Sequence, residues 1–89
     1  MGGSMTEEEI KTEIGEHTLG DYSIWTIGVT DRPDERKQEH ERDGENVSHW
    51  HQWDASTESV ARQIESYFID KGCKGAGGGG GEANYVYIF

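Results

Sequence analysis

The sequence predicts a small α+β domain, and three of its stretches lead to this prediction. Residues 21–30 are rich in β-branched and aromatic side chains, which favours a strand. Residues 57–71 carry apolar side chains three and four positions apart, a spacing typical of an amphipathic helix. The closing segment 84–89 is strand-like and apolar on both faces, so we expect it inside a sheet. We therefore expect a three-stranded, mainly antiparallel sheet packed with two main helices, 33–43 and 57–71.

A shorter helix is expected near the N-terminus. Residues 6–17 have helical composition, with Thr6 as a candidate N-cap. Ile10 and Ile14 are their only apolar side chains, so this helix would be marginal in isolation. Gly15 is expected to mark its end.

The helix over 33–43 is predicted by its ends. Pro33 suits its first turn, acidic residues follow at its positive end, and Gly44 would stop it. The helix has almost no apolar face. The aliphatic stems of Arg36 and Lys37 would therefore have to hold it in place.

The second strand and the second main helix follow. A strand is expected over 47–54, and the helix over 57–71 would be capped by Ser56 or Thr57 and end before Gly72. Alternation along the strand would place four side chains on one face: Val47, His49, His51 and Trp53.

The chain divides into three parts. Residues 1–5 look like an expression scar, 6–20 form an N-terminal segment, and 21–89 form a single domain. Residues 72–83 are rich in glycine and are expected to be a flexible linker before the last strand. A phosphate-binding loop is the alternative interpretation. However, no predicted strand directly precedes this segment, and no Gly-Lys-Ser/Thr sequence stands at its end.

The composition limits the function. The chain has 89 residues, with 18 acidic and eight basic side chains and a net charge of −10, which opposes unassisted binding to DNA. Such acidity suits high salt, so a halophilic source is one hypothesis. No apolar run approaches the roughly 20 residues that span a bilayer, and the lone Cys73 cannot form an internal disulfide. We therefore expect a cytoplasmic protein with no membrane partner.

A set of polar residues points to phosphodiester chemistry. Thr26-Ile27-Gly28 ends a strand that leads to a helix carrying Arg36 and, one turn later, His40. The later amphipathic helix carries Glu65 within its apolar side. An arginine can stabilise charge on a phosphate, a histidine can assist proton transfer, and a carboxylate can hold a divalent metal.

These residues resemble the GIY-YIG endonucleases. Thr26-Ile27-Gly28 stands where that family has its YIG strand, Arg36 and His40 match its helix positions, and Glu65 matches its metal-binding carboxylate. The resemblance covers roughly residues 24 to 71. It implies a GIY-YIG-like fold, DNA as a partner, and, in an active member, one Mg²⁺ held by Glu65, because Mg²⁺ keeps most of its waters.

The chain departs from the family at its first strand. The GIY strand that normally precedes the YIG strand has no counterpart upstream of Tyr22. The final residues 85–89 are similar to it in composition. We therefore expect a circularly permuted arrangement in which these residues pair with residues 22–29.

A second departure concerns the chemistry. Thr26 replaces the tyrosine that the family uses as a proposed general base, and its hydroxyl is a poor substitute for a phenol. Tyr87 or Tyr85 would have to supply the phenol from the last strand. Two functions follow: a catalytically silent interaction or structural module with an unknown protein partner, or a Mg²⁺-dependent endonuclease that cleaves DNA. The candidate catalytic residues are Arg36, His40, Glu65 and Tyr87.

Each feature also has a simpler interpretation. Arg36 can be a surface charge that pairs with Glu39 or Glu35, and Glu65 an ordinary helix position. His49 and His51 have a spacing that can chelate zinc or copper, but no third ligand is evident. The side chains of Trp25, Trp50 and Trp53 could stack on nucleic-acid bases. Core packing is the better account for at least two of these three tryptophans.

Overall fold

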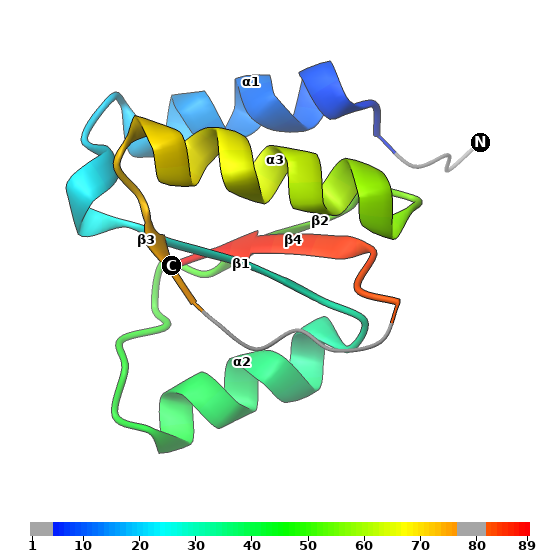
Figure 1. Ribbon diagram of the computed structural model, residues 1–89. Helices are drawn as coiled ribbons and strands as arrows, with labels where there is room; N and C mark the ends of the chain where they lie inside the picture. Colours follow the sequence, from blue (N-terminus) through cyan, green and yellow to red (C-terminus); the bar gives the residue numbers. More distant parts are fainter. Residues whose placement is uncertain (1–4, 77–81) are drawn as a thin grey trace.

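The structure is a computed structural model that describes residues 5–76 and 82–89 (Figure 1). Most of the predicted expression scar and the centre of the predicted linker lie outside these residues. The described parts form a mixed sheet of four strands with three α-helices and a short 3₁₀-helix, in the order α1 (Glu7–Thr18), η1 (Tyr22–Ile24), β1 (Thr26–Thr30), α2 (Pro33–Arg42), β2 (His51–Asp54), α3 (Glu58–Lys71), β3 (Lys74–Gly75) and β4 (Tyr85–Ile88).

The last strand occupies the interior of the sheet. The strand order is β2-β4-β1-β3, and β4 runs antiparallel to both of its neighbours. Its pairing with β1 extends from Ile27 opposite Ile88 to Thr30 opposite Tyr85. The predictions that the last strand pairs with residues 22–29 and lies inside the sheet are confirmed.

The prediction of three strands is wrong, because the chain adds β3 beside β1. Lys74 N–H donates to Trp25 O at 2.9 Å, and Ala76 N–H donates to Ile27 O at 2.8 Å. β3 runs parallel to β1, so the sheet is mixed. This strand begins inside the predicted linker. A lysine and a glycine carry no strand pattern, and backbone pairing with β1 together with contacts to α3 places them there.

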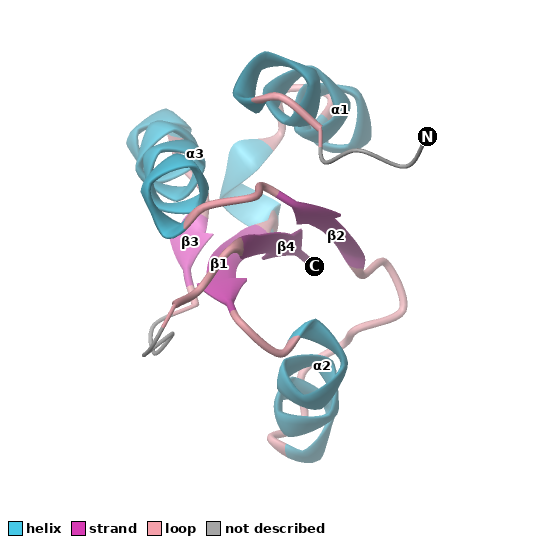
Figure 2. Cartoon of the chain, turned by 90° about the vertical axis from the view of Figure 1, so that its right-hand side faces the viewer, coloured by secondary structure: helices cyan, strands magenta, loops and turns pink. Residues whose placement is uncertain are grey.

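The helices cover both faces of the sheet. α1 and α3 lie side by side on one face, and α2 lies alone on the other (Figures 1 and 2). The face under α1 and α3 is the hydrophobic core, and its strand residues are Ile27, Val29, Trp53, Val86 and Ile88. The opposite face presents Tyr87 to α2. None of the helices in the described segments is long and apolar enough to span a bilayer.

Helix α1 matches the predicted stretch 6–17 to within one residue at each end, although Gly15 does not end it, and it is better anchored than its sequence suggests. It continues through Gly15 to Thr18, and its N-terminus has a full capping box in which Thr6 and Glu9 satisfy each other's backbone N–H groups. Ile10 and Ile14 are both 0 % exposed within the core shared with α3. Complete burial of two isoleucines compensates for the polar composition of this helix.

The remaining boundaries follow the prediction closely. α2 and α3 match their predicted ranges to within one residue, and Thr57 caps α3 by accepting from Val60 N–H at 3.2 Å. The two predicted strands start later than expected. The 3₁₀-helix η1 replaces the beginning of the first, and a turn at residues 47–50 replaces the beginning of the second.

Candidate active site

The site forms where β4 and β1 face α2. Side chains alternate along β4, so Val86 and Ile88 enter the core while Tyr87 points to the other face. Gly28 lies directly opposite Tyr87 in the sheet. A Cβ at Gly28 would lie 2.5 Å from the Tyr87 hydroxyl oxygen and 2.6 Å from Cζ. The glycine therefore provides the space that the tyrosine ring occupies.

Three of the predicted catalytic residues meet at the Tyr87 hydroxyl. Arg36 Nε donates to this oxygen at 3.2 Å, and His40 Nε2 lies 3.0 Å from it. Arg36 and His40 are one turn apart on α2, so both reach the sheet from the same side of the helix. Arg36 also donates from Nη1 to Glu39 at 2.8 Å, as the simpler interpretation expected. One edge of the guanidinium thus contacts Tyr87 and another contacts Glu39.

A hydrogen-bond chain runs from Arg36 to Glu45. His40 is 4 % exposed, and its Nδ1 contacts a carboxylate oxygen of Glu45. Glu45 accepts from Nδ1–H, so Nε2 accepts the proton of the Tyr87 hydroxyl. Burial raises the pKa of Tyr87, and the neighbouring Arg36 offsets this only in part, so the phenol stays protonated and can donate.

The sequence analysis missed Glu45. It stands beyond the end of α2 and outside any motif, so no pattern in the sequence marks it. The backbone turns back at Gly44, whose φ is +89°, and Glu45 N–H donates to His40 O at 3.1 Å. This turn is what returns the Glu45 carboxylate to His40.

Aromatic rings close the site on one side. Trp50 stacks on Tyr87 with ring centroids 4.4 Å apart, and Phe89 lies 5.6 Å from Trp50. Trp53 is a core residue and Trp25 packs against the core, which confirms core packing for two of the three tryptophans. Trp50 lies outside that core and covers the Tyr87 ring.

Glu65 belongs to α3, which covers the sheet face opposite α2 (Figure 2). Its side chain is 19 % exposed, and Arg62 Nη1 lies 3.9 Å from its carboxylate. Burial raises the pKa of Glu65, while Arg62 partly lowers it. The negative charge of Glu65 also helps to raise the pKa of Tyr87, so the two groups interact through space. The structure brings Arg36, His40 and Tyr87 into direct contact, whereas Glu65 is carried by the helix on the other face of the sheet.

The donor set near Glu65 is sparse. Among residues 5–76 and 82–89, no group of three or more histidine, cysteine, aspartate and glutamate side chains is arranged to hold a metal ion. Such a set does not suit zinc, which takes three or four protein ligands. It does fit Mg²⁺, which is held by one or two carboxylates together with water and substrate phosphate. Desolvation of the Glu65 carboxylate would also favour a nearby cation.

His49 and His51 do not share a strand face, so that prediction is wrong. His49 lies in the turn before β2, and its ring meets Trp25 edge-on at 6.5 Å. His51 stacks instead on His17 of α1, with ring centroids 3.7 Å apart. The two histidines therefore pack against different parts of the molecule.

The stacked histidines predict a loss of stability in mild acid. The pKa of His51 is lowered, first by burial and then by the charges of His17 and His49. As pH falls below the ordinary value of 6.5, the unfolded chain binds a proton at His51 before the folded chain does, so the free energy of unfolding decreases. Urea denaturation at about pH 7.5 and about pH 5.5 should show this decrease, and His51→Gln should reduce it. An unchanged pH dependence in His51→Gln would contradict the prediction.

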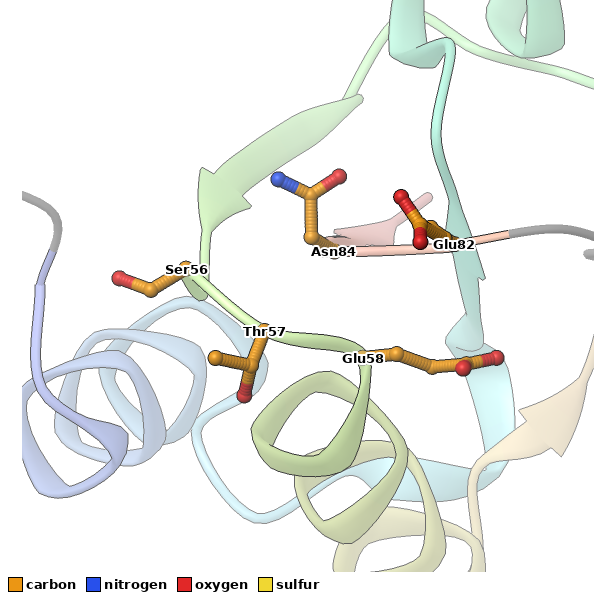
Figure 3. Close-up of a pocket in the computed structure, with 5 residues that line it drawn as sticks. All are labelled: Ser56, Thr57, Glu58, Glu82 and Asn84. Carbon is orange, nitrogen blue, oxygen red and sulfur yellow. The ribbon is translucent and has the colours of Figure 1, made fainter.

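A polar cavity of about 370 Å³ lies at the start of α3, lined by residues of the β2–α3 connection and of the segment before β4 (Figure 3). Two of its polar residues have local structural roles. Thr57 caps the helix, and Ser56 N–H donates to Asp54 Oδ1 at 2.8 Å. None of the predicted site residues lines this cavity.

The candidate active site therefore consists of Arg36, His40, Glu45 and Tyr87. Its residues come from α2, the turn after it and β4. A search with protein-family models finds no match to the chain, and comparison with curated proteins and with solved structures finds no significant similarity.

Proposed function

We propose that the protein is a metal-dependent endonuclease that hydrolyses phosphodiesters of nucleic acid, built on a circularly permuted GIY-YIG plan. The observation that carries the proposal is the Tyr87 hydroxyl, which contacts both Arg36 and His40. Arg36 and His40 lie near the middle of the sequence and Tyr87 near its end, 51 and 47 residues away. A phenol delivered by β4 to the arginine and histidine of α2 is what the permutation hypothesis requires.

Arg36 is the residue that binds the scissile phosphate. Its present partner Glu39 is 48 % exposed at the side chain, and exposed ion pairs contribute only about 0.2–1 kcal/mol. A phosphate oxygen can therefore replace Glu39 at little cost. The bond from Nε to Tyr87 remains in place and fixes the plane of the guanidinium, which matches phosphate geometry.

Tyr87 and His40 are buried residues that hold the geometry of the site. Tyr87 is 0 % exposed and His40 is 4 % exposed, so both act through their neighbours. Tyr87 orients Arg36. His40 links Tyr87 to Glu45, and this hydrogen-bond chain gives a proton a route from the buried phenol to a carboxylate that is 45 % exposed. Tyr87 and His40 are thus positioning residues here.

Glu65 would hold the metal ion. The ion would supply Lewis-acid stabilisation of the phosphate and lower the pKa of bound water. Burial raises the pKa of its carboxylate, and its charge helps to raise the pKa of Tyr87.

The proposal is tested by metal titration and by cleavage. Adding Mg²⁺, or Mn²⁺ as a paramagnetic probe, should change NMR signals of Glu65, Arg36 and His40, and the protein should cleave DNA at its preferred salt concentration. Glu65→Gln should abolish both responses. Glu58→Gln, in the first turn of the same helix, is the matched control and should keep them.

Glu65→Gln should also stabilise the fold. The raised pKa of Glu65 means that its neutral form is favoured in the folded state, so the stability it contributes is present at low pH and lost as pH rises through the folded pKa. Glutamine carries no charge at any pH, so at neutral pH the substitution removes the loss of stability that the buried carboxylate causes. Glu58→Gln should do the opposite, since it removes a favourable helix-dipole interaction and the pair with Arg62. A Glu65→Gln variant that is less stable and equally active would contradict the proposed role.

The second candidate function is a catalytically silent interaction module on the same fold. Burial of Tyr87 and His40, the existing Arg36–Glu39 pair and Thr26 in the YIG strand favour it. In that case the hydrogen-bond chain serves only to hold α2 on the sheet. If Mg²⁺ or Mn²⁺ caused no NMR shifts and the protein cleaved no DNA, the interaction module would be the remaining candidate function.

A further inference from the structure

An open cavity of about 310 Å³ lies where the chain ends, and we call it the Trp25 cavity. Trp25 and Phe89 are half-buried in its wall, and His49 and Ile24 are exposed at its rim. Glu45 and Asn46 also line the cavity. Its lining is more apolar than that of the polar cavity at the start of α3, and it includes aromatic rings.

The Trp25 cavity adjoins the candidate active site. Glu45 belongs to both, because it lines the cavity and contacts His40. Phe89 also bridges them, since its ring lies 4.7 Å from the ring of His40. The hydrogen-bond chain that begins at Arg36 therefore ends at the wall of this cavity.

The lining combines flat apolar faces with edge groups that can hydrogen-bond. Trp25 and Phe89 supply rings, and His49 meets the Trp25 ring edge-on. Asn46 Oδ1 accepts from Ser48 N–H and Oγ–H at 3.0 and 2.7 Å, so its amide nitrogen is the part that can donate to a ligand. An aromatic face with donors and acceptors at its edge is the chemistry of a nucleobase.

We propose that the Trp25 cavity is a subsite for one unpaired nucleobase of a strand whose phosphate binds Arg36. This inference rests on the proposed function and specifies its substrate class. A base inside a continuous duplex is stacked and paired, so it could enter the cavity only after being flipped out at the cost of unstacking and unpairing. The preferred substrate is therefore a single strand, a loop or another unpaired region.

The charge of the chain opposes any polyanion, so the affinity of this subsite must come from the base. With a net charge of −10, the protein has little long-range attraction for the phosphate backbone. Stacking of one base on an aromatic side chain is worth about 1–3 kcal/mol by alanine substitution, and this is the contribution that the Trp25 cavity would supply. The phosphate at Arg36 would contribute a logarithmic salt slope of about −0.7 on a single strand.

The test follows the Trp25 indole and Asn46 amide signals by NMR while a short oligothymidylate is added. Both signals should shift, and the same strand with abasic positions should shift neither. Trp25→Ala should weaken binding about 5- to 150-fold. Trp25 also packs on the core, so its replacement can affect folding. His49→Ala and Ile24→Ser therefore change exposed positions of the cavity rim. Their control is Leu19→Ser, at a residue that is 85 % exposed and lies outside the cavity.

Two results would overturn the inference. One is equal binding of the abasic strand, and the other is binding of a continuous duplex as tightly as the oligothymidylate. Cleavage that requires Arg36 and Glu65 but ignores Trp25 would leave the proposed function standing and remove only the subsite. Base-dependent shifts at Trp25 without metal-dependent cleavage would support a base-binding cavity and overturn the nuclease.

Discussion

Gly28→Ala is expected to destabilise the protein by about 3 kcal/mol. The new methyl group would lie 2.5–2.6 Å from the hydroxyl and Cζ of Tyr87 and 2.8 Å from the Ala76 Cβ. Tyr87 cannot withdraw, because Arg36 and His40 hold its hydroxyl and Trp50 covers its ring. Overpacking of this kind costs about 1–3 kcal/mol, and more where neighbours cannot move. Urea denaturation monitored by circular dichroism measures the change.

The matched control is Gly15→Ala. Gly15 lies within α1, and a Cβ there has no neighbour within 4 Å. Alanine at that position should stabilise the protein by about 0.5–1 kcal/mol through its higher helix propensity. If Gly28→Ala proved as stable as the wild type, the close contact between Gly28 and Tyr87 would be wrong.

Arg36→Lys is expected to reduce the rate of DNA cleavage about 10²- to 10³-fold, although it keeps the positive charge. Lysine has no Nε–H in the arginine position, so the bond to Tyr87 is lost, and its single ammonium cannot bind phosphate in the forked geometry. The rate constant for cleavage of a labelled oligonucleotide at saturating Mg²⁺ measures the effect.

Arg32→Lys is the control for this substitution. Arg32 is 68 % exposed at the side chain and pairs with Glu35 on the surface, so its replacement should leave the rate within about twofold. Equal rates for Arg36→Lys and the wild type would remove Arg36 from the site. Equal losses in both variants would point to a general effect of arginine on folding or on nucleic-acid attraction.

Much of the fold follows from local sequence signals. α2 and α3 were predicted nearly to the residue because proline, threonine and glycine mark their ends. The position of β4 inside the sheet followed from its apolar character on both faces. β3 did not follow, because the strand consists of a lysine and a glycine that are placed by backbone bonds to β1 and by contacts with α3. The continuation of α1 through Gly15 also escaped prediction, although the predicted range 6–17 was right to within one residue.

The site was predictable in its residue types but not in its connections. Arg36, His40 and Glu65 stand at spacings that suggested phosphodiester chemistry, and Tyr87 was a candidate phenol. The sequence does not show that Tyr87 is fully buried or that its hydroxyl joins Arg36 to His40. Glu45 was missed because its place beside His40 depends on the positive φ of Gly44. The Trp25 cavity likewise joins residues from three distant segments, which no local pattern brings together.

The central position of β4 has a consequence for how the protein folds. Both of its neighbours, β1 and β2, are made long before it, and neither pairs with the other. During synthesis only the short pairing of β1 with β3 can form before the last strand, so the β2-β4-β1 part of the sheet should assemble only when residues 85–88 have left the ribosome. Pairing of such distant segments is slow, because a long loop must close before any contact is gained. A chain shortened by its last few residues should therefore fail to join β2 to β1.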